Sequence, residues 1–551
     1  MSTTESLAFP TSAPATAALD ALFSAFNRSD KPGVIAGVSH KGQVIYRRGF
    51  GLASVEHGVA NSPVTRSRIG STSKQFACLG ILLLAEEGKV DVDASVRTFF
   101  PELPVLQGEA TLRQLMSHTS GYRCFLSTGF IANGMAIRPA GTVIPMQARQ
   151  SDVNFVPGER VMYNNSGCHL LSLIIQKVSG LPFAQFLKDR IFDVVGMVDT
   201  ASIPNDLEIH PGVATLHLTQ PNGHLMRGLF PMEDVLGEGA IVSTIDDMLR
   251  WMAHMRGPKK VGTEATWAQL KTVAKLNNGF DTNYGLGLFR HDYRGVEVIH
   301  HPGGVIGGYS QMLTVPSHEL DIIVMANWDA VHCINLAFGA LEAVLQESLT
   351  AQTGQAESKD FAPLIGRRYF SPSRDGYEFS FQDVGGKLGL STLNCPAVPL
   401  QAVDNRFWLD ALDNRSGGPF EFELTPQLES APAKLAMSDG RNAHTFELLP
   451  APAPDTLDAG NKLVGHYRAG DLNAEAEILL DGDRLLLKFY GEFGMSTMDL
   501  EAFSSELFGW KPRGGVPESG TLHVQQARGK VTSLLLDSFR TRHVLLERLA
   551  D

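Results

Sequence analysis

The alternation of apolar and polar residues divides the chain into two parts that predict different kinds of structure. In residues 1–350, apolar runs of helical length alternate with short strand-like segments. Helices are predicted at 74–87 and 167–179, from Thr244 onward, and at 334–348. Strands are predicted at 296–299 and 310–326, beside an earlier hairpin. Because strands lie at both ends of this part and helices between them, we expect one mixed α/β domain.

Two local signals in this part are more specific. The stretch "GVIAGVSHKGQVIYRRGFG" (33–51) predicts the hairpin, with its turn at Lys41 and Gly42. In "STIDDMLRWMAHM" the Thr244 hydroxyl can cap a helix, and Asp247 stands where a capping box places its acidic partner.

Beyond a polar segment at 347–360, which we interpret as a linker, the pattern changes to the two-residue period of β-strands. The motif "LIGRRYF" (364–370) is repeated as "LVGHYRA" (463–469), and an alternating segment with a glycine turn follows each copy. These copies predict two similar β-units at 361–450 and 461–551. A proline-stiffened joint, "APAPDTLDAG", lies between them.

Each β-unit has its own turn and core signal. In the first, Tyr377, Phe379 and Phe381 share one face of a predicted strand. In the second, a tight turn is predicted at Asp481 and Gly482.

Composition narrows the class of protein. With 551 residues the chain is too long for a single hydrophobic core. Apolar residues make up 43% and charged residues 19%, which is typical of a globular protein. The net charge is -12 and no Lys/Arg run occurs, so we expect neither a nucleic-acid nor a membrane partner. No apolar stretch has the roughly 18 residues of a membrane span.

The N-terminus and the cysteines bear on location. "MSTTESLAFPTSAPATAALD" has no basic start and no apolar core, so we expect no secretory signal and a cytoplasmic protein, with the periplasm left open. The five cysteines include no CxxC pair and are expected to be free, buried thiols. They are Cys78, Cys124, Cys168, Cys333 and Cys395.

The first candidate for chemistry is the pair Ser71 and Lys74 in "IGSTSKQFACLGILLLAEEG" (69–88). Residues three apart lie on one face of a helix, with roughly 5–6 Å between their Cβ atoms. If the apolar run buries the lysine, the neutral amine is favoured and can take the serine proton. The alternative is a helix cap with a lysine that extends to solvent.

Two further motifs follow. In "FVPGERVMYNNSGCHLL" (155–171), Tyr163 could relay protons, and Asn165 could orient the lysine and a substrate amide. The alternative is a turn tyrosine with a helix-capping asparagine. In "HHPGGVIGGYSQM" (300–312), His301 and Gly303 open a strand where glycines would let a substrate approach the backbone. The alternative there is a glycine-rich loop with a surface histidine.

In this order and spacing, S-x-x-K, Y-x-N and H-x-G resemble the serine β-lactamase and penicillin-binding-protein superfamily, whose motifs include S-x-x-K, S-D-N and K-T-G. The second motif is that of its class C branch. Other similar stretches are "LMSHTSGY" (115–122), "GEGAIVSTIDDMLRW" (237–251) and "NYGLGLF" (283–289). The resemblance covers about residues 20–345. It implies a β-lactamase-like α/β (α+β) catalytic domain at 1–350, followed by two antiparallel β-barrel domains.

The resemblance also implies roles for residues. Ser71 is the nucleophile, Lys74 the general base, and Tyr163 shares the proton transfer. Asn165, His301 and Gly303 line the site, and the backbone N–H groups of Ser71 and Gly304 form the oxyanion hole. The reaction passes through an acyl-enzyme that water hydrolyses. Neither a metal nor a cofactor is implied.

The third motif departs from K-T-G and bears on the substrate. A lysine is a permanent cation that can hold a carboxylate, whereas a histidine of ordinary pKa is mostly neutral at pH 7. Recognition of a substrate's C-terminal carboxylate is therefore expected to be weak. The length and the H-x-G motif are similar to those of D-aminopeptidases. There, a loop of the last barrel enters the active site, and "FYGEFGMSTM" (489–498) resembles that loop. We expect its residues to act as a gate: Gly491, Glu492, Phe493 and Gly494.

Several functions stay open at this point. We favour a peptidase or amidase that cleaves small peptides or amino-acid amides, with D-residues at the N-terminus. The alternatives are a hydrolase of linearised cyclic-peptide toxins such as linear microcystin, a carboxylesterase, and an acylatable sensor without turnover. A metal hydrolase is disfavoured because the histidines include no H-E-x-x-H. Homo-oligomerisation is left open.

Overall fold

The computed structural model describes residues 13–351, 354–371, 377–403, 406–409, 420–424, 426, 428–439 and 442–550. The chain divides into two compact units, and each is described by itself. The first unit comprises Met1–Ala94, Cys168–Ala274 and Asn283–Ala351. The second comprises Ser95–Gly167, Lys275–Thr282 and Gln352–Asp551. Residues 1–12, on which the expectation about a secretory signal depends, lie outside the described part.

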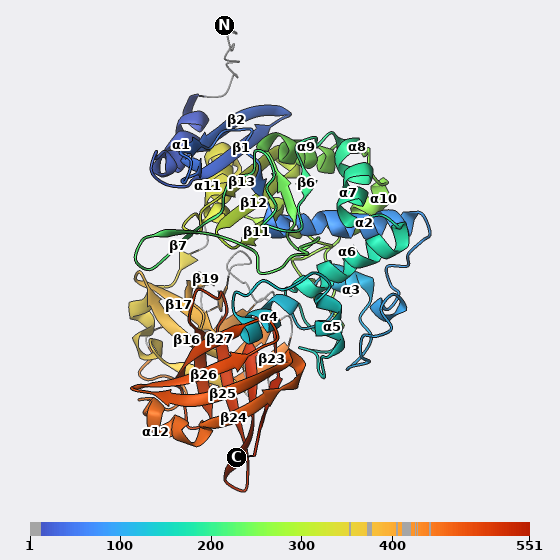
Figure 1. Ribbon diagram of the computed structural model, residues 1–551. Coiled ribbons are helices and arrows are strands. Elements are labelled where there is room, and N and C mark those ends of the chain that lie inside the picture. The colour runs from blue at the N-terminus through green and yellow to red at the C-terminus, as the bar shows by residue number, and fades with distance from the viewer. Residues whose placement is uncertain are drawn as a thin grey trace. The chain divides into compact units, whose positions relative to one another are not determined.

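The first unit is built on a six-stranded antiparallel sheet with the order β10-β11-β12-β13-β1-β2 (Figure 1). Its strands come from both ends of this part of the chain, as predicted. They are β1 (Val34–His40), β2 (Gln43–Phe50), β10 (Phe289–Tyr293), β11 (Val296–Val305), β12 (Gly308–Val315) and β13 (Leu320–Ala326). The β1–β2 hairpin turns at Lys41 and Gly42, which both have positive φ, and this confirms the predicted turn.

The strand register assigns side chains to the two faces of this sheet. His301 pairs with Met312, Met312 with Ile323, and Ile323 with Gly37, so these four residues share one face. Helix α9 (Ile245–Arg256) packs on that face at Gly37, where a Cβ atom would lie 2.1 Å from Ile245.

His300 lies on the opposite face because neighbouring residues of a strand alternate. Its ring is 5.6 Å from that of Phe338, in α11 (Cys333–Leu345). Adjacent histidines therefore point to opposite sides of the sheet.

The helix predictions in this unit hold. The helices α2 (Lys74–Glu86), α6 (Asn165–Ser179) and α11 match the three predicted ranges to within a few residues. Thr244 caps α9 by accepting a hydrogen bond from the Asp247 N–H at 3.3 Å. The Asp247 carboxylate instead accepts hydrogen bonds from the Asp199 N–H and the Thr200 hydroxyl, both at 2.8 Å. Only half of the predicted capping box is therefore formed.

The second unit combines residues 95–167 with the C-terminal strands. Its short helices are α3 (Leu112–Met116), α4 (Phe125–Asn133) and α5 (Val143–Ala148). Nothing in the hydrophobic pattern indicated that this stretch packs with the β-units. The division at 1–350, 361–450 and 461–551 stays a prediction.

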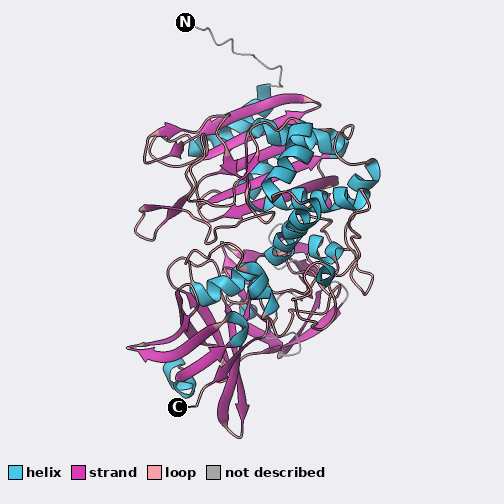
Figure 2. Cartoon of the chain, turned by 45° about the vertical axis from the view of Figure 1, so that its right-hand side comes forward, coloured by secondary structure: helices cyan, strands magenta, loops and turns pink. Residues whose placement is uncertain are grey.

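The β-rich part of the second unit contains two antiparallel β-structures (Figure 2). One is a ten-stranded, nearly closed barrel with the order β14-β19-β20-β21-β22-β23-β15-β16-β17-β18. Its strands are β14 (Gly354–Gln355), β15 (Arg368–Ser371), β16 (Tyr377–Val384), β17 (Lys387–Thr392), β18 (Val398–Pro399), β19 (Gln401–Val403), β20 (Arg406–Trp408), β21 (Phe420–Glu423), β22 (Lys434–Asp439) and β23 (Asn442–Leu448).

The other is a closed barrel of eight strands in sequence order. They are β24 (Gly465–Ala469), β25 (Ala474–Asp481), β26 (Arg484–Tyr490), β27 (Met495–Ala502), β28 (Leu507–Pro512), β29 (Gly520–Ala527), β30 (Lys530–Ser538) and β31 (Val544–Arg548). The predicted fold, a β-lactamase-like part followed by two antiparallel barrels, is confirmed.

The repeated L-x-G motif has the same place in both barrels. The strand after it pairs with the next strand and with the last strand of its barrel: β15 with β16 and β23, and β24 with β25 and β31. Two details differ from the prediction. Asp481 pairs with Arg484, so the turn is Gly482 and Asp483. The predicted linker contributes β14, the edge strand of the ten-stranded barrel.

Each barrel has its own hydrophobic core. Tyr377, Phe379 and Phe381 are fully buried in the first, as their shared face predicts. The core of the closed barrel also includes Ile131 and Ala132 from α4. Among the described residues no single helix is long and apolar enough to cross a membrane, and only a pair bent by 81°, Asn165–Ser179 with Phe183–Val195, passes by length and composition.

Candidate active site

Ser71 and Lys74 form a hydrogen-bonded pair in the first unit. Ser71 lies in a short 3-10 turn (Gly70–Ser73) that continues directly into α2. The Lys74 Nζ donates to the Ser71 Oγ at 3.0 Å and to the Glu238 carbonyl at 2.9 Å. The lysine is fully buried, so it does not extend to solvent. No serine side chain caps α2, and the capping alternative is wrong.

Close packing of the turn on β11 explains the glycines around this pair. Gly70 has φ +51, and a Cβ there would lie 2.8 Å from the Gly304 nitrogen. A Cβ on Gly303 would lie 1.9 Å from the Ile69 carbonyl oxygen. Gly303 is therefore required by chain packing, and the approach of a substrate there stays a prediction. Gly304 is exposed, and a Cβ there would meet only the Tyr309 ring, at 3.5 Å.

Hydrogen bonds fix the turn at both ends. The Thr72 hydroxyl donates to the His301 carbonyl at 3.0 Å, and the Ser310 hydroxyl donates to the Ile69 carbonyl at 2.8 Å. Strands β11 and β12 thus determine where the Ser71 hydroxyl lies.

His301 is fully buried, which contradicts the surface-histidine alternative. Its Nδ1 lies 2.6 Å from the Pro302 carbonyl and donates to it, so Nε2 accepts a hydrogen bond from the Tyr284 hydroxyl at 3.0 Å. Burial lowers the pKa of His301 to about 3, and the nearby Lys74 adds to the effect. The imidazole is neutral at physiological pH, so the third motif supplies no cation.

Sequence reasoning missed a buried ion pair behind Lys74. The His169 Nδ1 lies 3.0 Å from the Glu238 Oε1, and both side chains are buried. Burial alone would lower the pKa of His169, but the charge and hydrogen bond of Glu238, with Asp234 beyond it, raise it. Glu238 therefore links the pair to the lysine through its own carbonyl. Glu238 stands in the quoted "GEGAIVST", and nothing in that stretch indicates a histidine partner.

Tyr163 lies in the second unit between a histidine and an arginine. The centroids of the Tyr163 and His118 rings are 4.3 Å apart, and the Arg540 guanidinium lies 4.8 Å from the Tyr163 centroid. The Asn164 N–H donates to the His118 Nδ1 at 3.2 Å, which fixes the ring beside the phenol. His118 belongs to the quoted "LMSHTSGY", but its role was not predicted.

The two asparagines of the second motif have different partners. Asn164 is a helix-capping asparagine: its side chain accepts a hydrogen bond from the Ser166 N–H at 2.6 Å and donates one to the Tyr122 carbonyl. Asn165 is the first residue of α6, and its amide donates to the Cys124 Sγ at 3.7 Å. The part of α6 from Cys168 onward belongs to the first unit.

The predicted gate, Gly491 to Gly494, connects β26 and β27 and packs on the end of α4. The Phe493 N–H donates to the Asn133 Oδ1 at 2.9 Å, and a Cβ on Gly491 would lie 2.4 Å from that oxygen. Glu492 accepts from the Asn473 amide at 3.0 Å. The gating role stays a prediction.

The candidate residues thus divide between the units. Ser71, Lys74, His301, Gly303 and Gly304 belong to the first, and Tyr163, Asn165 and the 491–494 segment to the second.

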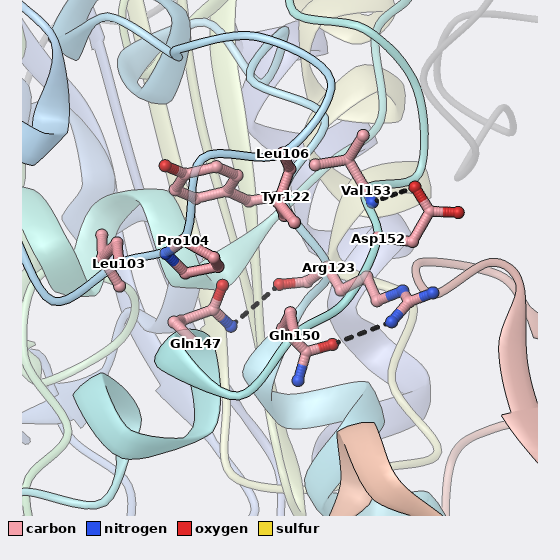
Figure 3. A pocket seen from close by; sticks show the side chains of 9 residues that line it. All are labelled: Leu103, Pro104, Leu106, Tyr122, Arg123, Gln147, Gln150, Asp152 and Val153. Carbon is pink, nitrogen blue, oxygen red and sulfur yellow. Dashed lines mark hydrogen bonds between the residues drawn. The ribbon is translucent and has the colours of Figure 1, made fainter.

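A small pocket in the second unit contains none of the predicted catalytic residues (Figure 3). The Arg123 carbonyl accepts a hydrogen bond from the Gln147 amide at 3.1 Å. The Arg123 guanidinium donates a hydrogen bond to the Gln150 Oε1, also at 3.1 Å. The lining residues are Leu103, Pro104, Leu106, Tyr122, Arg123, Gln147, Gln150, Asp152 and Val153.

Comparison with known proteins places the chain in a family. The sequence profile described as Beta-lactamase matches residues 19–333, which is more than half of the chain. The chain belongs to the beta-lactamase family. The resemblance carried by the three motifs is therefore confirmed.

This beta-lactamase family chain is similar to D-aminopeptidases along nearly its whole length. It is 28% identical to a D-aminopeptidase of Gluconobacter oxydans (strain 621H), over 94% of this chain and 96% of that protein. It is 25% identical to one of Cereibacter sphaeroides (strain KD131), over 96% and 97%.

Solved structures of low sequence identity share the fold. The octameric penicillin-binding protein homologue from Pyrococcus abyssi has a TM-score of 0.55 and 21% identity, over 78% of this chain and all of that one. The D-amino acid amidase from Ochrobactrum anthropi SV3 has a TM-score of 0.51 and 22% identity, over 61% and 99%.

Proposed function

We propose that the protein is a serine hydrolase that cleaves amino-acid amides and small peptides through an acyl-enzyme on Ser71. The observation that carries this proposal is the buried Lys74 amine, 3.0 Å from the Ser71 Oγ. An amine at hydrogen-bonding distance from a hydroxyl can take its proton as a general base. Membership of the beta-lactamase family supports the assignment.

The residues suggest the order of steps. The Lys74 amine takes the Ser71 proton while the Oγ attacks the substrate carbonyl, and the oxyanion is bound by the N–H groups of Ser71 and Gly304. Tyr163 passes a proton to the leaving amine as the C–N bond breaks. Water then attacks the acyl-enzyme, which releases a carboxylic acid and restores the serine hydroxyl.

The neutral His301 and the similarity to D-aminopeptidases narrow the class of substrate that we propose. Without a cation in the third motif, binding of a C-terminal carboxylate is weak. The D-aminopeptidases that resemble the chain over nearly its full length favour a substrate with a free N-terminal D-residue. Hydrolysis of linearised toxins such as linear microcystin, and ester hydrolysis, are the alternatives that share this chemistry. A sensor that is acylated without turnover is the third.

Labelling and turnover test the proposal. We expect a fluorophosphonate probe to label Ser71 in the wild type, but neither Ser71→Ala nor Lys74→Ala. Lys89→Ala, which changes an exposed lysine, is the control. Amino-acid p-nitroanilides of both configurations are then compared with p-nitrophenyl esters. A folded protein with unlabelled Ser71 would overturn the mechanism, and ester turnover with no anilide cleavage would reject the amidase assignment.

A further inference from the structure

A loop of the closed barrel holds an arginine against Tyr163. Arg540 lies between β30 and β31, and two hydrogen bonds fix its backbone. Its carbonyl accepts from the Cys124 N–H at 3.2 Å and from the Asn154 amide at 3.1 Å. The neighbouring Arg542 N–H donates to the Asn154 Oδ1 at 2.8 Å. These contacts place Arg540 in the same unit as the second motif.

The Arg540 side chain is half-buried and is directed at the phenol ring. Its guanidinium lies 4.8 Å from the Tyr163 centroid, which is within the range of a cation–π contact. The buried Nε has no hydrogen-bond partner among the described residues. The guanidinium is therefore not fully engaged by hydrogen bonds that would explain its burial.

Two titratable groups of the unit, His118 and Glu518, lie beside this contact. His118 lies on Tyr163, and its Nδ1 accepts the Asn164 N–H. Glu518 is half-buried, accepts from the Ser127 hydroxyl at 2.6 Å and interacts with Arg540. Burial raises the pKa of Glu518, while Ser127 and Arg540 oppose the rise. Of these groups and Arg540, only the guanidinium keeps a fixed charge throughout the physiological pH range.

A phenol that passes protons needs help to carry negative charge. Phenols ionise near pH 10, so a Tyr163 that cycles its proton near pH 7 requires a nearby cation. His301 is neutral, and Lys74 must lose its proton to act as a base. Arg540 is the permanent cation that the structure brings to the ring.

We propose that Arg540 is a positioning residue that stabilises the ionised form of Tyr163, so that the C-terminal barrel supplies the charge which the third motif lacks. The inference rests on the proposed function, in which Tyr163 shares the proton transfer with Lys74. Under this proposal, a residue of the closed barrel acts on the proton transfer through Tyr163.

A direct titration tests this without any turnover. The absorbance of tyrosinate near 295 nm is followed from pH 7 to 11 in the wild type and Tyr163→Phe, and the difference isolates Tyr163 among the ten tyrosines. The same pair is made in an Arg540→Gln background. We expect the Tyr163 midpoint to rise by about one pH unit without the arginine. Arg540→Lys, which keeps the charge, should recover at least half of that shift.

Most of the other tyrosines have raised pKa values and interfere little with the titration of Tyr163. Burial raises the pKa of Tyr122, Tyr369 and Tyr467 to about 12, and the pKa values of Tyr46, Tyr293 and Tyr490 are also raised. Arg548→Gln is the matched control, because Arg548 lies over the Tyr467 ring in the same barrel at 5.8 Å. It should leave the Tyr163 midpoint unchanged.

Kinetics provide the second measurement. Arg540→Gln should lower kcat on an anilide about tenfold, move the limb of the pH profile that reports Tyr163, and leave KM within twofold. Arg540→Lys should restore most of kcat. An unchanged Tyr163 midpoint in folded Arg540→Gln would overturn the inference even if the enzyme turns over. A wild type that never acylates Ser71 would instead overturn the proposed function, and the titration would still decide about Arg540.

Discussion

At the scale of single residues, Gly70 tests whether the Ser71 turn must lie against β11. Alanine at Gly70 costs about 1 kcal/mol for its positive φ and also forces the turn away from Gly304. We expect Gly70→Ala to slow fluorophosphonate labelling of Ser71 at least tenfold. Gly42→Ala is the matched control, because Gly42 also has positive φ but no atom lies within 4 Å of an added Cβ. Labelling of Gly70→Ala at the wild-type rate would contradict the assigned geometry.

The buried His169–Glu238 pair predicts a pH dependence of stability. The pKa of His169 is raised in the folded state. The histidine therefore contributes its full stabilisation below its unfolded-state pKa, near 6.5, and this stabilisation is lost as the pH rises through its folded-state pKa. His169→Gln keeps a hydrogen-bonding side chain but removes the charge. The difference in the free energy of unfolding between wild type and His169→Gln should therefore shrink from pH 6 to 9. Urea titrations across this range measure it.

His254 predicts the opposite pH dependence of stability and serves as the control. Burial lowers its pKa to about 4, and Lys259 and Lys260 add to the effect. Its contribution is complete above pH 6.5 and is lost as the pH falls toward 4. A wild-type advantage over His169→Gln that grows with pH would show that the histidine is neutral when folded.

Contacts between site residues were predictable where the partners are close in sequence. Ser71 and Lys74 are three apart, so helix geometry alone places them together. His169 and Glu238, or Tyr163 and Arg540, are separated by long stretches of chain, and no local pattern signals such pairs. The pair Gly303 and Gly304 shows a subtler limit, because the sequence marks both as glycine but only the fold shows which one packing requires.

At the scale of elements, the period of the hydrophobic pattern predicted the helices and the repeated β-unit. The repeat was readable because the same L-x-G motif precedes the strand that pairs with the last strand of each barrel. The ends of elements were predicted less well. The turn after β25 lies one residue beyond the predicted position. The Asp247 carboxylate accepts hydrogen bonds from Asp199 and Thr200 and does not complete the capping box at the start of α9.

The loop between β26 and β27 carries an element-scale prediction. An added Cβ on Gly491 would lie 2.4 Å from the Asn133 Oδ1 and 2.7 Å from the Ala132 carbonyl, so Gly491→Ala must shift the loop away from α4. If the loop selects substrates, the ratio of kcat/KM for D- over L-anilides should change at least threefold. Gly470→Ala, in the same barrel with no atom within 4 Å, should leave it unchanged. An unaltered ratio in folded Gly491→Ala would end the gating hypothesis.

At the scale of the whole molecule, the hydrophobic pattern predicted the kinds of structure but gave no sign that residues 95–167 contact the barrels. Residues 95–167 read as part of the N-terminal α/β domain, yet they pack with the barrels. The reason is a set of contacts that no periodicity reveals. Ile131 and Ala132 complete the core of the closed barrel, and the buried Arg123 pairs with Asp471.

Those contacts predict that the closed barrel cannot simply be removed. The Arg123 guanidinium also donates to the carbonyls of Arg542 and His543, both at 2.8 Å. A chain that ends at residue 455 loses all of these acceptors and exposes the apolar end of α4. Breaking one buried ion pair costs about 3–5 kcal/mol, against a typical total stability of about 5–15 kcal/mol. We therefore expect the truncated chain to be insoluble or to unfold without a cooperative transition.

A single substitution tests the Arg123–Asp471 ion pair in the intact chain. Asp471→Asn keeps every barrel strand but leaves the Arg123 charge without its counterion. We expect it to lower the free energy of unfolding by about 3 kcal/mol while the folded fraction still acylates Ser71. Asp483→Asn, at an exposed turn of the same barrel, should change stability by less than about 0.5 kcal/mol. A soluble fragment ending at 455 that unfolds cooperatively and labels at Ser71 would show that residues 95–167 do not need the barrel for their fold.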